Sequence, residues 1–178
     1  MQKTIFMMAV TTIMFACNNE KKEPVTVEGK PLKPAVALPY TPIYSTSFEM
    51  GDPANTALIL QGSWKDWEEN KLDNMKNWVA DTVIAFHADN AVVNGRDSLM
   101  ARWKRGRAGY SSVIDTLNAA MAVYSTDKKE DWVLIWATEI NTNTAGKADT
   151  AQVMETWRIN KDGKADMLFQ HDRARRKQ

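Results

Sequence analysis

The sequence predicts a single α+β domain in which a helical layer comes first and a long antiparallel sheet follows. Apolar side chains recur at spacings of three and four in the segments 53–70 and 95–106, as in amphipathic helices. The segment 113–171 instead contains four strand-like stretches separated by polar loops. The chain has 178 residues, of which 44% are hydrophobic, so one domain with short additions can bury a core. We therefore expect a curved antiparallel sheet wrapped over N-terminal helices.

The first helix is expected to begin at Asp52 and Pro53, because Asp is a good N-cap and Pro suits the first helical position. The helix should end near Asn70, and its apolar stripe consists of Ala57, Leu60, Trp64 and Trp67. Asp73 can cap a short second helix that carries Trp78.

Two short strands are expected next, at residues 82–87 and 91–93, where apolar runs flank a turn. Gly95 then opens a third helix, which carries Leu99 and Trp103 on one face. This order of elements completes the predicted helical layer.

The C-terminal half is predicted to form the rest of the sheet, with strands at 113–124, 132–141, 151–159 and 165–171. The second of these strands is apolar on both faces, which predicts a central strand covered on both sides. One face carries Trp132, Leu134, Trp136, Thr138 and Ile140, and the other carries Val133, Ile135, Ala137 and Glu139. Residues 160–163 form a tight hairpin turn with a glycine where a positive φ is needed.

Residues 1–16 are typical of a secretory signal. Lys3 supplies the positive start, and residues 5–16 form a mostly apolar run of roughly 18 Å as a helix, short of the ~30 Å membrane core. Cys17 ends this run after the small residue Ala16, so the segment resembles a bacterial lipoprotein signal in which the cysteine thiol is acylated. An ordinary cleaved signal with an incidental cysteine is the alternative.

The stretch 17–52 is predicted to be a lipid-anchored linker, because it holds five of the six prolines and shows no sustained helical or strand period. Each buried methylene of an acyl chain contributes ~0.8 kcal/mol, so two or three chains on Cys17 would hold the protein on a membrane. We therefore expect a lipid-anchored protein of the cell envelope, at the outer membrane or the periplasm, with the surface that it faces left open. The folded domain is expected at 53–173, followed by a basic tail at 174–178.

Charge and cysteine content exclude several classes of function. The 23 Lys and Arg residues against 22 Asp and Glu leave a net charge of +1, which gives no case for nucleic-acid binding. A single cysteine excludes an internal disulfide and a cysteine-built metal centre within one chain. The two histidines, His87 and His171, are 84 positions apart and form no ligand motif, so we expect neither a metal nor a cofactor.

Three stretches in a fixed order are similar to the nuclear transport factor 2-like superfamily, in its SnoaL-like and ketosteroid-isomerase-like branch. They read LDNMKNWVADTVIAFH, then VVNGRDSLMARWKRG, then WRINKDGKADMLFQH. The resemblance covers residues 55–172, which is nearly all of the folded part. It implies a cone in which a strongly bent sheet encloses an apolar pocket closed by helices, with a homodimer formed through the outer face of the sheet.

The resemblance also assigns a candidate catalytic position. It places His87 where ketosteroid-isomerase-like members carry an Asp base, and Ser63 where they carry the tyrosine that stabilises the enolate. A neutral imidazole can abstract a proton near pH 7, but the oxyanion donor is missing, so ketosteroid isomerisation is not expected. If the protein is an enzyme, we expect His87 to act with Asp89 or Asp97. Otherwise, His87 is simply hydrogen-bonded at the rim of the pocket.

The unusual number of tryptophans, seven in the chain, suggests an apolar binding site. Core packing is expected for Trp78 and Trp132, whereas the residues expected to line a ligand pocket are Trp64, Trp67, Trp103, Trp136 and Trp157. The first hypothesis is therefore a lipid-anchored domain that binds a small apolar or amphipathic ligand, or a protein partner, without catalysis. The alternatives are an isomerase-, cyclase- or dehydratase-type enzyme that uses His87, and a purely structural dimerisation module.

Overall fold

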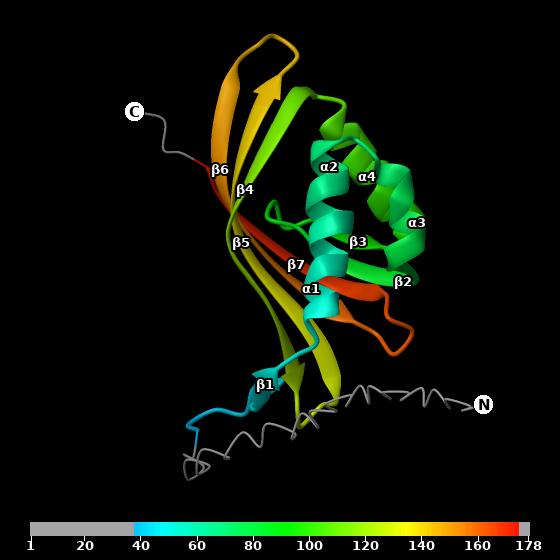
Figure 1. The fold of residues 1–178 in the computed structure, drawn as a ribbon, viewed down its shortest axis with the longest axis vertical. Helices are drawn as coiled ribbons and strands as arrows, with labels where there is room; N and C mark the ends of the chain where they lie inside the picture. Colours follow the sequence, from blue (N-terminus) through cyan, green and yellow to red (C-terminus); the bar gives the residue numbers. More distant parts are fainter. Residues whose placement is uncertain (1–37, 175–178) are drawn as a thin grey trace, which may run out of the picture. The chain divides into compact units, whose positions relative to one another are not determined.

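The computed structural model describes residues 38–174 of the chain (Figure 1). The predicted signal peptide, the acylation site Cys17, most of the linker and residues 175–178 of the tail lie outside the described residues. Within the described part, no helix combines the length and the apolar character needed to cross a membrane. Residues 40–174 belong to one compact unit.

The first predicted helix forms, but it is wound in three parts. α1 (Pro53–Ile59) continues as the π-helical segment η1 (Leu60–Lys65) and then as α2 (Asp66–Glu68). As predicted, Asp52 caps it, because its Oδ1 accepts from the backbone N–H of Ala54 at 2.8 Å. Gly62 in η1 lies against the Trp78 ring so closely that a Cβ there would approach the ring to 2.5 Å. This glycine therefore sets how closely η1 packs on the core.

The remaining helices cover the same face of the sheet (Figure 1). The short second helix consists of η2 (Leu72–Asn74) and α3 (Met75–Trp78), and α4 (Arg96–Arg107) follows Gly95, whose φ of 85° favours glycine. The predicted cap by Asp73 is wrong, since Asp73 lies inside η2 and pairs with Lys104 at 2.6 Å. A salt bridge to α4 takes the place of a local cap.

The sheet is curved and unclosed, and it has seven strands in the order β1-β4-β5-β6-β7-β2-β3. The strands are β1 (Phe48–Met50), β2 (Val79–Phe86), β3 (Val92–Asn94), β4 (Tyr110–Ser125), β5 (Glu130–Asn143), β6 (Ala148–Ile159) and β7 (Ala165–Ala174). The expected antiparallel meander is confirmed for β4 to β7. One pair departs from the prediction: β2 and β7 are parallel. Residues 84–86 lie opposite residues 167–169 in this pair. The two segments are so far apart in the chain that local sequence patterns do not predict their pairing.

Ordered structure begins before the predicted domain boundary at residue 53. β1 lies in the stretch assigned to the linker, and it pairs with β4. Just before β1, the Ser45 hydroxyl donates to Asp127 Oδ1 at 2.6 Å. Asp127 also accepts from the hydroxyl of Ser125 at 2.8 Å and from the backbone N–H of Thr46 at 3.0 Å. These hydrogen bonds hold the pKa of Asp127 well below its ordinary value. The end of the predicted linker therefore belongs to the folded unit.

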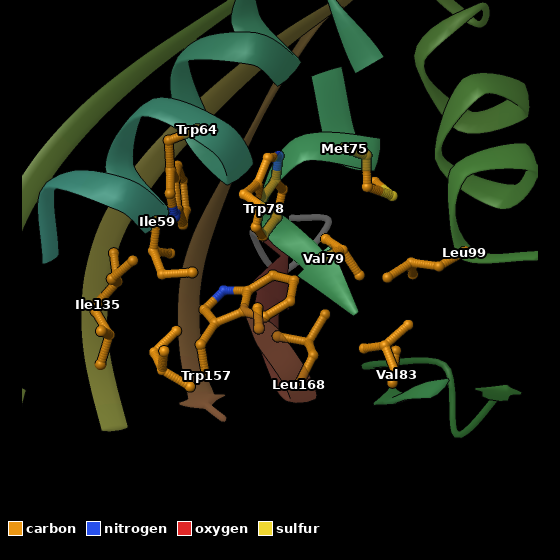
Figure 2. Packing of buried hydrophobic residues seen from close by; sticks show 14 of the residues in the cluster. Ile59, Trp64, Met75, Trp78, Val79, Val83, Leu99, Ile135, Trp157 and Leu168 are labelled. Atoms are coloured by element: carbon orange, nitrogen blue, oxygen red, sulfur yellow. The ribbon is translucent and has the colours of Figure 1, made fainter. Parts of the chain in front are cut away.

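The core lies between the helices and the inner face of the sheet. Trp157 is fully buried at its centre, with Ile135 and Leu168 from neighbouring strands and the Trp78 ring at 5.2 Å (Figure 2). The strand predicted to be central, β5, indeed pairs with β4 on one side and β6 on the other. The outer face of β5 is partly exposed, and so are Ile114 and Met121 on β4 and Met154 on β6. A homodimer through this outer face stays a prediction.

Candidate functional site

A cavity of about 880 Å³ lies between the helical layer and the inner face of the sheet. Three tryptophans from η1, α2 and α4 form its apolar wall: Trp64, Trp67 and Trp103. Polar side chains of β5, β6 and β7 form the opposite wall, and they include Glu139, Asn141, Glu155 and Gln170. The cavity is thus amphipathic, with aromatic rings on one side and hydrogen-bonding groups on the other.

His87, directly after β2, enters this cavity as part of a hydrogen-bonded chain of side chains. The residue is 8% exposed and lines the cavity, and its Nδ1 lies 3.0 Å from Gln170 Oε1. Gln170 Nε2 in turn donates to Glu155 Oε1 at 3.1 Å. The other ring nitrogen of His87, Nε2, is buried and has no partner among the described residues. Burial lowers the pKa of His87, only partly opposed by the hydrogen bond to Gln170, so the neutral imidazole is favoured near pH 7.

Glu155 is the most buried carboxyl group of the site, with 3% of the residue exposed. Besides the bond from Gln170, its Oε2 accepts from the Trp157 indole N–H at 2.8 Å and from the Ser63 hydroxyl at 3.0 Å. Burial raises the pKa of Glu155, although these three hydrogen bonds act in the opposite direction. Since Ser63 donates to Glu155, its hydroxyl hydrogen is not available to a ligand.

A second carboxyl group lies further along the same wall. Glu139 Oε2 accepts from the Trp67 indole N–H at 2.7 Å, and its Oε1 accepts from the amide of Asn141. Burial raises the pKa of Glu139, and both hydrogen bonds oppose this shift. The bond from Trp67 ties the aromatic wall of the cavity to its polar wall.

Asp115 of β4 faces Glu139 across the β4–β5 pair and lies in a neighbouring pocket of about 380 Å³. Both of its carboxylate oxygens are buried and lack a partner within residues 38–174. Burial, followed by the nearby charges of Glu139 and Glu68, raises the pKa of Asp115 to about 7. The inner face therefore carries several carboxyl groups whose ionisation is disfavoured.

The two carboxylates predicted to act with His87 are not part of the cavity lining, although the charge of Asp89 does raise the pKa of His87. Asp89 Oδ2 accepts from Arg102 at 2.6 Å, and Asp97 has an 80% exposed side chain that lies 3.5 Å from Arg96. The group connected to His87 is Glu155, through Gln170.

Three of the five tryptophans predicted for a pocket do line the cavity: Trp64, Trp67 and Trp103. Trp157 is instead fully buried in the core beneath it. Trp136 lies on the outer face, in register with Met154, because strand alternation turns it away from its inward neighbours Ile135 and Ala137. Among residues 38–174, no three His, Cys, Asp or Glu side chains are grouped so as to hold a metal ion.

The sequence interpretation missed the buried Glu155 and the partly buried Glu139 and Asp115 as site residues. For Glu139 the signal was present, since it continues the face of Val133, Ile135 and Ala137 that alternation predicts to be buried. A charged residue on an apolar face indicates a partner or a function. No such local signal marked Glu155, whose partners come from η1 and β7.

Comparisons with known proteins identify the fold. No family model and no curated protein matches the chain, but several solved structures resemble it. One is described as a SnoaL-like polyketide cyclase from Shewanella denitrificans, with a TM-score of 0.57 and 12% identity over 68% of this chain and 92% of that one. A nuclear transport factor 2-like protein of unknown function from Burkholderia pseudomallei gives 0.53 and 16%, over 68% and 91%.

An LEH-like epoxide hydrolase from Mycobacterium tuberculosis resembles the chain to a similar extent, with a TM-score of 0.54 and 10% identity over 67% of this chain and 82% of that one. The chain therefore has the nuclear transport factor 2-like fold, as the sequence resemblance implied. Identities this low establish a common fold and no common activity. The function must be argued from the side chains of the cavity.

Proposed function

We propose that the protein is a lipid-anchored envelope protein whose cavity binds a small amphipathic molecule without catalysing its conversion. The observation that carries the proposal is the cavity of about 880 Å³, with tryptophans on one wall and the polar side chains of β5, β6 and β7 on the other. A volume of this size suits a ligand of a few hundred daltons. The fold supports the small-molecule part of the proposal, because the structures that resemble it include proteins named for acting on small molecules.

The absence of turnover is proposed from the hydrogen bonds of the site. Stabilisation of developing negative charge is usually the largest contribution to catalysis in reactions of this type, and it needs a donor aimed at the reacting oxygen. In the described cavity, Ser63 donates to Glu155 and the Trp67 indole donates to Glu139, so these donors are already engaged. Ser63, the position that the resemblance assigns to the enolate-stabilising donor, therefore has no free donor.

Native mass spectrometry of the full chain purified from its own host tests ligand binding. We expect a non-covalent adduct of a few hundred daltons that disappears on denaturation. Trp67→Ala, which removes part of the aromatic wall, should reduce the adduct, whereas the control Trp136→Ala on the outer face should retain it. A chain without an adduct whose tryptophan fluorescence also responds to no amphipathic probe would contradict the proposal.

The anchor is tested separately by fractionating cells that express the wild-type chain or Cys17→Ser. We expect the wild-type chain in the membrane fraction and the variant in the soluble fraction, because the thiol is the proposed site of acylation. A Cys17→Ser chain that stays in the membrane fraction would show that acylation of this residue is not the anchor.

A second candidate function, proton transfer by His87, is favoured by its buried and partnerless Nε2. A neutral imidazole in an apolar cavity is a competent general base. Elimination of 5-nitrobenzisoxazole, which needs only a base beside an apolar surface, provides a generic assay. A rate above background that falls in His87→Leu and persists in Asp97→Asn would favour an enzyme over a binding protein.

A further inference from the structure

The stretch that precedes β1 lies on the outer face of the sheet, on the side opposite the cavity. We call residues 40–47 the strap. The Tyr44 ring in the strap makes edge contacts with Trp132 of β5 at 5.7 Å and with Phe169 of β7 at 5.4 Å between ring centroids. Trp132 shares the outer face of β5 with Trp136, yet only 4% of Trp132 is exposed. The strap therefore covers one end of the outer face.

Asp127, in the turn between β4 and β5, holds the strap beside Tyr44. Its carboxylate accepts from the Ser45 hydroxyl at 2.6 Å, and from both the backbone N–H and the hydroxyl of Thr46 at 3.0 Å. These hydrogen bonds lower the pKa of Asp127, so the group is ionised near neutral pH and keeps these contacts. The strap is thus fixed at two points, one aromatic and one polar.

The contact of Tyr44 reaches the cavity through the parallel pair of β2 and β7. Phe169 stacks on Phe86 of β2, with 4.9 Å between the ring centroids and 7° between the ring planes. The residues that follow these two phenylalanines are Gln170 and His87, which line the cavity and are joined by a hydrogen bond of 3.0 Å. Because side chains alternate between the two faces of a sheet, the aromatic stack and this hydrogen bond hold the same two strands from opposite sides.

The backbone pairing between β2 and β7 is short at this place. Its register shifts between Val79 and Ile84, and beyond the shift only residues 84–86 pair with residues 167–169. Parallel pairing is also slightly less stable per residue than antiparallel pairing. Side-chain contacts on the outer face therefore contribute to the relative position of these two strands.

We propose that the strap regulates the cavity from the opposite face of the sheet. While Tyr44 packs on Phe169, β7 and β2 hold Gln170 and His87 in the arrangement that binds the ligand, and release of the strap weakens binding. This inference rests on the proposed binding function and adds a regulatory element to it. Tyr44 is a positioning residue, since it does not line the cavity.

The pKa of His87 reports the state of this strand pair without any ligand. Burial lowers this pKa, the hydrogen bond to Gln170 raises it, and the charges of Arg102 and Asp89 act in opposite directions. Release of the strap should admit water to the ring and so raise the pKa toward its ordinary value. NMR titration measures the pKa, and His171→Gln assigns the signals of the two histidines.

Three variants of the strap are compared, each in the full chain carrying Cys17→Ser. Tyr44→Ser removes the ring and should raise the pKa of His87, whereas Tyr44→Phe keeps the ring and should leave it unchanged. Ile43→Ser is the matched control, because Ile43 is the neighbouring strap residue and is 86% exposed. Equal pKa values of His87 in Tyr44→Ser and Ile43→Ser would contradict the proposal.

The neutral fluorescent probe N-phenyl-1-naphthylamine measures binding in the same variants. Trp67→Ala shows which part of the signal comes from the cavity, since Trp67 is part of the cavity wall. We expect Tyr44→Ser to bind the probe about two- to ten-fold more weakly than Ile43→Ser, as the loss of one aromatic pair predicts. Equal affinities in these two variants would show that the strap does not control binding.

Asp127→Ala releases the other end of the strap and leaves the aromatic rings unchanged, so it also serves if Tyr44→Ser does not fold. We expect it to raise the pKa of His87 and to weaken probe binding, as Tyr44→Ser does. Lys128→Ala, at the exposed neighbouring position, is its control. No difference between these two variants would contradict the role of the strap.

The outcomes separate this inference from the proposed function. If the probe binds in the cavity but neither readout responds to release of the strap, the cavity binds ligands and the regulation is wrong. If the probe does not bind the parent chain, the regulation of binding is contradicted, and the adduct in native mass spectrometry decides separately whether the binding function fails.

Discussion

The inner face of the sheet has two ends of opposite chemistry on the same strands. Along β5, β6 and β7, inward positions at one end are apolar and fill the core, and towards the other end several are polar and line the cavity. The apolar set is Val133, Ile135, Trp157 and Leu168, and the polar set is Glu139, Asn141, Glu155 and Gln170. Strand alternation determines which residues point inward, but only their neighbours determine whether they form a core or a site.

The side chains at the two ends are also stabilised by different interactions. At the apolar end, side chains pack on one another and on the tryptophans of the helices. At the polar end, carboxylates bind indole, amide and hydroxyl donors, and some acceptors are left over. The comparison teaches that packing of apolar side chains stabilises one end, whereas hydrogen bonds to buried carboxyl groups hold the other. Four predictions follow this contrast from its largest expected effect to its smallest.

Ile135→Ala should have the largest effect on stability. Ile135 is fully buried at the apolar end, and truncating such a side chain leaves a cavity that costs about 2–5 kcal/mol. Urea denaturation measures the loss. Met154→Ala, on the partly exposed outer face, should cost clearly less, and equal losses in the two variants would contradict the assignment of the core to the inner face.

Gln170→Leu should destabilise the protein less, by about 1–3 kcal/mol, because it leaves His87 Nδ1 and Glu155 Oε1 without their shared partner. Gln170→Glu is the informative companion variant, since it retains the size of the side chain but places a second carboxyl group beside Glu155. A Gln170→Leu protein with unchanged stability would refute the connection.

Asp115→Asn should change how stability depends on pH. The pKa of Asp115 is about 7 in the folded protein and near 3.8 when unfolded. The protonated group therefore contributes stability fully below pH 3.8, and this contribution is lost as pH rises through about 7. Denaturation at pH 5 and pH 8 should show a smaller loss for Asp115→Asn than for the wild-type chain. An identical loss in both would show that Asp115 is not the group that titrates.

Asp97→Asn should have the smallest effect, within about 0.5 kcal/mol, because its side chain is 80% exposed and lies 3.5 Å from Arg96. Probe binding should also be unchanged, since Asp97 is outside the cavity. Denaturation and the fluorescence titration measure both quantities. A loss of binding in this variant would revive the sequence-based hypothesis that Asp97 acts with His87.

Much of the fold could be predicted from local patterns. The helix capped by Asp52, the helix after Gly95 and the strands of the meander each depend on residues within a few positions of one another. The pocket tryptophans on helices were predicted well, because Trp64 and Trp67 share an apolar stripe. The position of Trp136 was predicted wrongly, because the sequence of a strand that is apolar on both faces does not show which face the helices cover.

The sequence by itself determined the order of helices and strands, the curved sheet, and the place of His87 at the end of a strand. Only the tertiary structure decided that β2 lies parallel to β7, which brings His87 beside Gln170 and, through it, Glu155. The physical reason is that hydrogen bonds between distant segments depend on strand register and on which layer covers each face. Both are properties of the whole folded chain.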